Sequence, residues 1–123
     1  MFGFYRVATA VPRLQVADVP FNTKEIITLM RQGAENRASV LLFPELCITG
    51  YTCGDLFHQS YLLDKAEDAL SEIVKASKGS DTIIIIGLPV RFNCRIFSAA
   101  VVIQNGGIRG VVPKSTLPNY REF

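Results

Sequence analysis

Two patterns of hydrophobic and polar residues alternate along the chain and predict strands and helices in turn. Apolar or β-prone runs cover Tyr5–Val11, Ser39–Phe43 and Thr82–Val90. Short apolar runs bounded by breakers are typical of buried strands, and the second run has the continuous pattern of a strand covered on both faces. The third run contains four consecutive isoleucines, which we expect only in an interior strand.

Between these runs, apolar residues recur at the spacing of one helix face. The first helix is expected to start with Asn22 or Thr23 as its N-cap and to continue to Arg37. The second is expected to begin near Ser60 and to end at Lys78-Gly79. The residues on this face are Ile26, Ile27, Met30 and Ala34 in the first helix, and Leu63, Ala66, Leu70, Ile73, Val74 and Ser77 in the second.

The last part of the chain predicts a hairpin. Two β-prone runs, Arg95–Gln104 and Ile108–Val112, flank Asn105-Gly106-Gly107, whose residue types tolerate positive φ. The resulting order is β-α-β-α-β-β-β, an α/β fold in which two right-handed crossovers build a parallel sheet and a hairpin extends it. Only two helices are available to cover this sheet, so its other face needs a second layer from more chain or from a partner.

Composition and charge exclude several classes of function. The chain of 123 residues is 49% hydrophobic and 20% charged, as expected of a globular domain or part of one. Its net charge is only +2, and the basic residues form no stripe, so no nucleic-acid partner is expected. No apolar run approaches the roughly 20 residues that cross a bilayer, and residues 1–6 do not resemble a secretion signal. We therefore expect a cytoplasmic protein without a membrane partner.

Glu45 and Lys114 are the strongest candidates for chemistry. Each follows an apolar strand and a proline, in Phe43-Pro44-Glu45 and in Val112-Pro113-Lys114. If these strands run in the same direction, both side chains emerge at one end of the sheet, where open α/β sheets bind ligands. A carboxylate and an ammonium there suit a proton acceptor and an oxyanion stabiliser. The alternatives are a solvated carboxylate at a strand end and an ordinary surface lysine.

The other reactive side chains are weaker candidates. His58 is the single histidine and lacks partners at metal-ligand spacing, so no metal site is expected. Cys47, Cys53 and Cys94 also lack such spacing and are expected to be buried free thiols in a reducing compartment. Tyr51 suits either a packing role or a hydroxyl pointing into a site. The chain has no glycine-rich phosphate loop.

Together, these motifs resemble the nitrilase (carbon–nitrogen hydrolase) superfamily, through Phe43-Pro44-Glu45 with Gly50-Tyr51 and through Pro113-Lys114-x-x-Leu117-Pro118. Longer motifs are similar to the glutaminase domains of glutamine-dependent NAD synthetases, and the resemblance covers essentially the whole chain. They are Val16-Ala17-Asp18-Val19-x-Phe21-Asn22, Glu45-Leu46-x-x-x-Gly50-Tyr51-x-x-Gly54-Asp55-Leu56-Phe57 and Lys114-x-x-Leu117-Pro118-x-Tyr120-x-x-Phe123.

This resemblance implies part of an α-β-β-α sandwich with a Glu-Lys-Cys triad. Glu45 would be the general base, and Lys114 would be the cation beside the tetrahedral intermediate. Tyr51 and Tyr120 would help to shape a glutamine pocket. In these enzymes a thiolate attacks the side-chain amide of glutamine, and the ammonia passes to an ATP-dependent synthetase domain that amidates deamido-NAD.

The chain departs from the family pattern at the nucleophile, which the family places beyond the lysine motif. Cys47, Cys53 and Cys94 do not fall at that position. We therefore expect residues 1–123 to be the N-terminal portion of one glutaminase domain, inactive alone and without the synthetase domain. No cofactor is expected in this portion, while ATP and Mg would bind the missing domain. A sheet with one bare face also predicts a homo-oligomer.

Three other functions remain as alternatives. They are a stand-alone amidase or nitrilase acting on another amide, a non-catalytic nitrilase-like module used in assembly, and a flavodoxin-like nucleotide-binding protein. The last is disfavoured, because no phosphate-binding glycine-rich turn follows the first strand.

Overall fold

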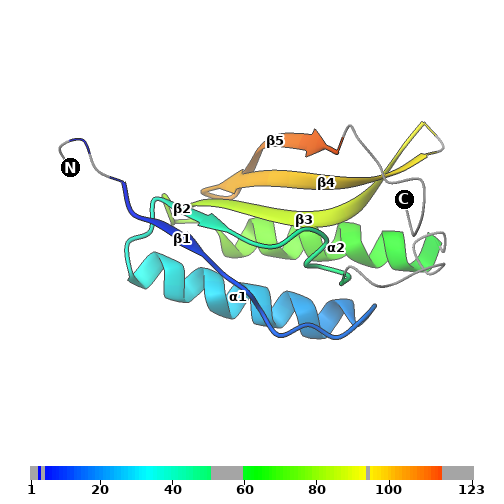
Figure 1. Cartoon of the computed structure of the whole chain (residues 1–123), viewed down its shortest axis with the longest axis horizontal. Helices are drawn as coiled ribbons and strands as arrows, with labels where there is room; N and C mark the ends of the chain where they lie inside the picture. Colours follow the sequence, from blue (N-terminus) through cyan, green and yellow to red (C-terminus); the bar gives the residue numbers. More distant parts are fainter. Residues whose placement is uncertain (1–2, 4, 51–59, 94, 115–123) are drawn as a thin grey trace.

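The computed structural model describes residues 3, 5–50, 60–93 and 95–114, and these residues build one sheet with two helices (Figure 1). The element order is β-α-β-α-β-β-β, as the hydrophobic pattern predicts. The strands are β1 (Val7–Thr9), β2 (Val40–Leu42), β3 (Ile83–Phe92), β4 (Arg95–Gln104) and β5 (Gly107–Pro113), and the helices are α1 (Val19–Glu35) and α2 (Ser60–Ala76).

The strands lie in the order β1-β2-β3-β4-β5. The first three are mutually parallel, whereas β4 is antiparallel to both β3 and β5. Two reversals of direction make β5 run the same way as β2. The carboxyl ends of β2 and β5 therefore meet at the same edge of the sheet, and this is where Glu45 and Lys114 follow their strands.

Both helices pack on one face of the sheet (Figure 1), and the core lies between the two layers. The register places Leu41, Ile84 and Ile103 side by side on this face, and all three are buried. The helices contribute fully or nearly fully buried side chains from their apolar faces: Ile26 and Met30 from α1, and Leu62, Ala66, Ala69 and Ile73 from α2.

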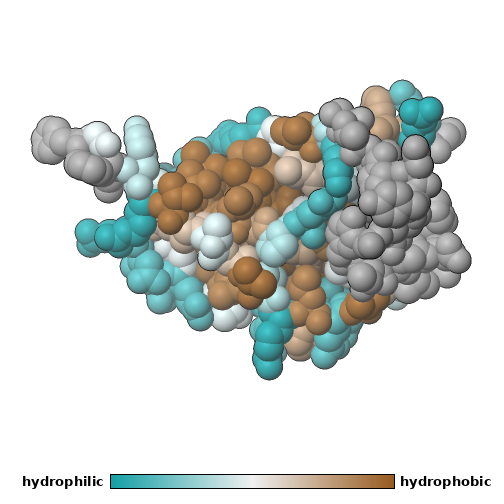
Figure 2. Space-filling model, viewed as in Figure 1, coloured by the Kyte–Doolittle hydropathy of each residue, from teal (hydrophilic) through white to brown (hydrophobic). Residues whose placement is uncertain are grey.

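No described element covers the opposite face of the sheet. Leu42, Ile85 and Val102 are register partners on that face, and Leu42 is 43% exposed. Figure 2 shows a broad hydrophobic area over the strands, on the side of the molecule away from the helices. Within the described residues only one layer packs on residues 39–43, and the cover predicted for their second face stays a prediction.

The first helix begins earlier than the sequence analysis predicts. Its N-cap is Asp18, whose carboxylate accepts a hydrogen bond from the Phe21 amide at 3.2 Å. Pro20 lies in the first turn, where its fixed φ suits a helix and its missing N–H costs nothing. Asn22 and Thr23 lie inside the helix and are buried. The N-cap prediction is wrong because Asp18 and Pro20 together form an earlier start signal.

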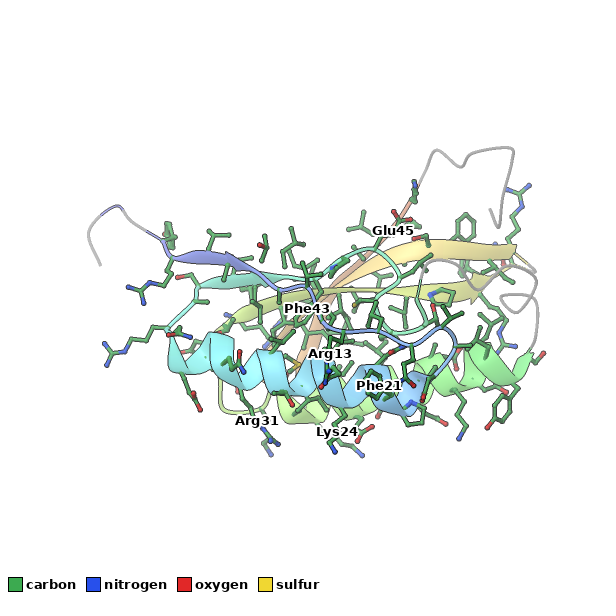
Figure 3. All side chains as sticks on the ribbon, turned by 60° about the horizontal axis from the view of Figure 1, so that its bottom comes forward. Arg13, Phe21, Lys24, Arg31, Phe43 and Glu45 are labelled. Atoms are coloured by element: carbon green, nitrogen blue, oxygen red, sulfur yellow. The ribbon has the colours of Figure 1, made fainter. Side chains whose placement is uncertain are left out.

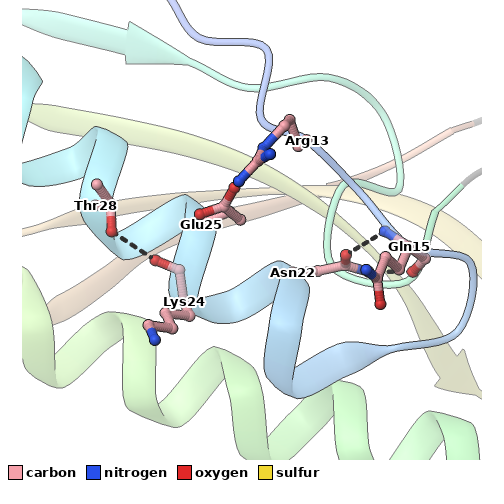
Figure 4. A network of polar contacts seen from close by, with 6 residues as sticks. All are labelled: Arg13, Gln15, Asn22, Lys24, Glu25 and Thr28. Atoms are coloured by element: carbon pink, nitrogen blue, oxygen red, sulfur yellow. Dashed lines mark hydrogen bonds and ion pairs between the residues drawn. The ribbon is translucent and has the colours of Figure 1, made fainter.

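Asn22 instead connects three segments of the chain. Its side-chain amide donates to the carbonyls of Gln15 and Ile48, both at 2.9 Å. Its Oδ1 accepts a hydrogen bond from the Gln15 amide at 2.8 Å, and Figure 4 shows Asn22 beside Gln15. Ile48 belongs to the turn that follows Glu45. The buried amide therefore holds the chain before α1 and the turn after β2 against the helix.

Replacing Asn22 by leucine is expected to lower the free energy of unfolding by about 3 kcal/mol, because it leaves buried backbone groups without partners. Urea unfolding of the two proteins measures the difference. Thr28→Ala is the matched control on α1, since the Thr28 hydroxyl bonds the Lys24 carbonyl at an exposed position. That variant should change stability by less than about 0.5 kcal/mol. Equal effects of the two substitutions would contradict the role given to Asn22.

Candidate functional site

The turn that carries Glu45 follows directly from β2. Phe43 is buried in the core, Pro44 follows it, and residues 45–49 then form a turn in which the Gly50 amide donates to the Leu46 carbonyl at 2.8 Å. Leu46 has a φ of 53° and is fully buried. A left-handed conformation costs a leucine about 1–2 kcal/mol, and burial of its side chain offsets that cost.

This turn lies directly on β3. The Phe43 amide donates to the Ile85 carbonyl at 2.9 Å, and the Ile48 amide donates to the Gly87 carbonyl at 3.2 Å. Gly87 permits the contact, because a Cβ at this position would overlap the Leu46 nitrogen and lie 3.0 Å from the carbonyl carbon of Glu45. A glycine within a strand often marks such a close approach of another backbone. The backbone of Glu45 is therefore placed by β3 as well as by β2.

Lys114 is placed by the hairpin. Its amide donates to the Ser98 carbonyl at 2.8 Å, which continues the β4–β5 ladder beyond the pairing of Ala99 with Pro113. The backbone hydrogen bond fixes Lys114 opposite Ser98 at the end of β5. The lysine therefore leaves the sheet at the edge where the turn after β2 brings in Glu45.

The structure brings the two predicted residues together. Lys114 Nζ lies 3.5 Å from Glu45 Oε2, and the two side chains are 39% and 40% exposed. Ser98 Oγ donates to the same carboxylate oxygen at 2.7 Å. Figure 3 shows Glu45 beyond the sheet, on the side away from the helices. A half-exposed ion pair of this kind contributes only about 0–1 kcal/mol to stability.

A cavity of about 300 Å³ opens beside this pair. Its polar side chains are Glu45, Ser98 and Lys114, and most of its other lining is apolar. A concave apolar surface with a few convergent polar groups is the usual form of a small-molecule site. The remaining lining residues are Leu42, Phe43, Pro44, Ile85, Ile86, Gly87, Ala99, Ala100, Val112 and Pro113.

Cys47 lies two residues from Glu45 but on the opposite side of the turn. Its side chain is fully buried in the core, and its Sγ lies 3.7 Å from the Gly87 carbonyl. Burial raises the pKa of this thiol from 9.0 to about 11, although hydrogen bonds to the backbone act in the opposite direction. The thiol is protonated at neutral pH and does not line the cavity. Its predicted burial is confirmed, and it is unsuited to be a nucleophile.

Alkylation measures this property of Cys47 directly. With a pKa near 11, the thiolate fraction at pH 7.5 is about 100-fold smaller than for a thiol of pKa 9.0. We expect iodoacetamide to modify Cys47 at least about 100-fold more slowly in the folded protein than in urea, with the folded rate rising up to pH 11. Peptide mapping separates Cys47 from Cys53 and Cys94. Equal rates in the two states would contradict its burial.

Several predicted residues lie outside the described part of the chain. Tyr51 and Tyr120, expected in a glutamine pocket, are among them, as are His58, Cys53 and Cys94. Their placement stays a prediction. In residues 3, 5–50, 60–93 and 95–114, no group of three or more histidine, cysteine or acidic side chains is arranged to hold a metal ion. No helix of this described part is long and apolar enough to cross a membrane.

The sequence alone did not predict two residues of the site, Ser98 and Gly87. Ser98 is a polar residue in an otherwise apolar stretch of β4, and Gly87 interrupts the apolar run of β3. Both are signals that a polar contact or a close backbone approach is present. Neither signal identifies Glu45 as the partner, because that depends on how the strands pair.

The chain is similar to known proteins over nearly all of its length. The model of the carbon–nitrogen hydrolase family matches residues 6–123. Glutamine-dependent NAD(+) synthetases of Mycobacterium leprae and Mycobacterium tuberculosis are each 40% identical over 121 residues, which is 98% of this chain and 18% of theirs. The relative from Aquifex aeolicus is 32% identical over 108 residues, covering 88% of this chain and 19% of its own. The chain thus spans less than a fifth of these relatives.

Solved structures show the same fold. A glutamine-dependent NAD(+) synthetase from Cytophaga hutchinsonii matches 94% of this chain and 20% of its own with a TM-score of 0.87 and 29% identity. The match to the enzyme from Acinetobacter baumannii, in complex with ADP, covers 94% of this chain and 22% of that enzyme, with a TM-score of 0.86 and 26% identity. The match to an amidase from Nesterenkonia sp. AN1 has a TM-score of 0.79 and 21% identity, and it covers 96% of this chain and 46% of the amidase. The described elements match one helical layer and one sheet of this α/β fold, as predicted.

Proposed function

The chain belongs to the carbon–nitrogen hydrolase family, and from this premise we propose that it is part of a glutamine-dependent NAD synthetase. Its activity would be hydrolysis of the glutamine side-chain amide, which supplies ammonia for the ATP-dependent amidation of deamido-NAD to NAD. The observation that carries the proposal is the Glu45–Lys114 pair beside an apolar cavity. The 40% identity to such synthetases over 98% of the chain supports glutamine as the amide.

In the proposed reaction, Glu45 acts as the general base. Its carboxylate takes the proton of a cysteine thiol, because a thiol is a good nucleophile only as the thiolate. The sulfur bonds to the amide carbon of glutamine and forms a tetrahedral oxyanion. Lys114, whose ammonium lies 3.5 Å from the carboxylate that acts as the base, would stabilise that negative charge.

The second half of the reaction releases the products. The carbon–nitrogen bond breaks, and Glu45 returns its proton to the leaving nitrogen, which departs as ammonia. Water then attacks the thioester carbon while Glu45 accepts a proton from it. The carbon–sulfur bond breaks, glutamate leaves, and the thiol regains a proton. One carboxylate thus serves as base and acid in alternation.

The remaining components of the proposal lie outside the described residues. Because Cys47 is buried, we place the nucleophile on a cysteine elsewhere, and we place Tyr51 and Tyr120 around the glutamine. ATP with Mg²⁺ and deamido-NAD would bind a synthetase domain beyond this N-terminal portion. The uncovered apolar face of the sheet supports a further layer or a homo-oligomer. We propose a cytoplasmic location for the enzyme.

A stand-alone amidase is the second candidate, supported by the fold shared with the Nesterenkonia amidase. A non-catalytic assembly module is disfavoured, because it would not need an acid–base pair beside a cavity.

Substrate assays on the full-length protein distinguish these functions. We expect glutamate release from glutamine to exceed the hydrolysis of asparagine or butyramide at least about 100-fold in kcat/KM. With ATP and deamido-NAD added, NAD should form with glutamine as the nitrogen source. Preference for a simple aliphatic amide without NAD formation would favour the stand-alone amidase. Absence of any amide hydrolysis would favour the assembly module.

A further inference from the structure

Ser98 contacts both members of the Glu45–Lys114 pair. It lies within β4 and is only 3% exposed, so its hydroxyl requires a hydrogen-bond partner. That partner is Glu45 Oε2, at 2.7 Å. The backbone carbonyl of Ser98 accepts a hydrogen bond from the Lys114 amide at 2.8 Å. One residue on a central strand therefore holds the acidic side chain and the backbone of the basic residue.

The two donors meet on a single oxygen of the carboxylate. Ser98 Oγ and Lys114 Nζ both contact Oε2, whereas no residue of the described chain donates a hydrogen bond to Oε1. A carboxylate can accept hydrogen bonds on both oxygens. The oxygen that Ser98 and Lys114 leave open is available to take a proton.

We propose that Ser98 is a positioning residue, which holds Glu45 through Oε2 so that Oε1 receives the thiol proton. This inference rests on the proposed function. The glutamate side chain is 40% exposed, and its contact to Lys114 is a 3.5 Å ion pair, a kind of contact that restrains a side chain weakly. The short bond from a buried hydroxyl is the stronger restraint. A base must lie within hydrogen-bond reach of the proton that it abstracts, and small displacements lower the rate steeply.

The proposal predicts a change in kcat without a matching change in KM. In the full-length protein, Ser98→Ala should lower kcat for glutamine hydrolysis about 10- to 100-fold, because the carboxylate loses its fixed orientation. KM should stay within about 2-fold, because Ser98 positions the base and does not itself bind the substrate. Ser98→Thr, which keeps the hydroxyl, should recover most of the lost rate.

A matched control separates positioning from a general loss of stability. Thr82 is also buried, at 6% exposure, and its hydroxyl donates to the Ala38 carbonyl at 2.8 Å, away from the residues that line the cavity. Thr82→Val deletes a buried hydroxyl, just as Ser98→Ala deletes the hydroxyl of Ser98. The Thr82→Val variant should leave kcat unchanged. Melting temperatures of both variants show how much each substitution affects folding.

A double-mutant cycle shows whether Ser98 acts through Glu45. If it does, adding Ser98→Ala to Glu45→Gln should lower the residual rate no further. Wild-type kcat in Ser98→Ala, additive losses in the double variant, or an equal loss of kcat in Thr82→Val would each overturn the inference while leaving the proposed function in place. Full glutamine hydrolysis by Glu45→Gln would overturn both.

Discussion

Replacing Glu45 by glutamine is expected to lower glutamine-supported NAD synthesis by about 10²- to 10⁴-fold, the range of a general base. The substitution preserves side-chain size and removes the charge that accepts the thiol proton. Lys114 and Ser98 keep an oxygen to contact at this position, so the fold of the site should persist. NAD synthesis from free ammonium should stay near the wild-type rate, because ammonium bypasses amide hydrolysis.

The control for this prediction is the same substitution at another ion pair. Glu25 on α1 contacts Arg13 at 3.2 Å (Figure 4), and Glu25→Gln should leave both rates unchanged. Rates of NAD formation with glutamine and with ammonium, measured on the same preparations, provide the comparison. A Glu45→Gln protein with the wild-type glutamine-supported rate would show that Glu45 is not the base. Equal loss with both nitrogen sources would indicate a folding defect.

Replacing Gly87 by alanine is expected to displace the turn that carries Glu45. The added Cβ would overlap the Leu46 nitrogen and approach the Pro44 carbonyl oxygen to 3.0 Å, and both neighbours are backbone atoms that cannot rotate away. We expect stability to fall by about 3 kcal/mol, as for overpacking of a rigid site. Because the carboxylate moves with its backbone, glutamine hydrolysis should fall at least about 100-fold.

Gly110→Ala is the matched control for Gly87→Ala. Gly110 lies in β5, and a Cβ added there would meet nothing within 4 Å. This variant should change the free energy of unfolding by less than about 0.5 kcal/mol and leave hydrolysis unchanged. Urea unfolding and glutamate release are measured for both. If Gly87→Ala matches Gly110→Ala in either property, the close approach of the turn to β3 does not position Glu45.

The sequence pattern predicts most of the fold because the relevant signals are local. The isoleucine run of β3 and the Asn105-Gly106 turn identify their elements directly. The strand–proline–charge pattern makes Glu45 and Lys114 candidates, and parallel topology is enough to bring them to one edge. The start of α1 is missed because its cap, Asp18, lies before the apolar periodicity begins.

The contacts that complete the site were beyond sequence analysis because they depend on register. Ser98 contacts Glu45 across 53 positions of the chain, and Gly87 lies under the turn only because β2 and β3 pair as they do. A shift of one residue in a strand would move either residue to the other face of the sheet. The placement of Tyr51 and Tyr120 in a glutamine pocket is predicted from the family resemblance alone.

The most direct test of the account is to label the nucleophile of the full-length protein with a chloromethyl ketone analogue of glutamine. Peptide mapping identifies the cysteine that loses its proton and displaces chloride. The account predicts a label on a cysteine other than Cys47, Cys53 and Cys94, formed at least about 100-fold more slowly in Glu45→Gln. A label on Cys47, or an unchanged rate in Glu45→Gln, would contradict the assignment of Glu45 as the base that activates the thiol.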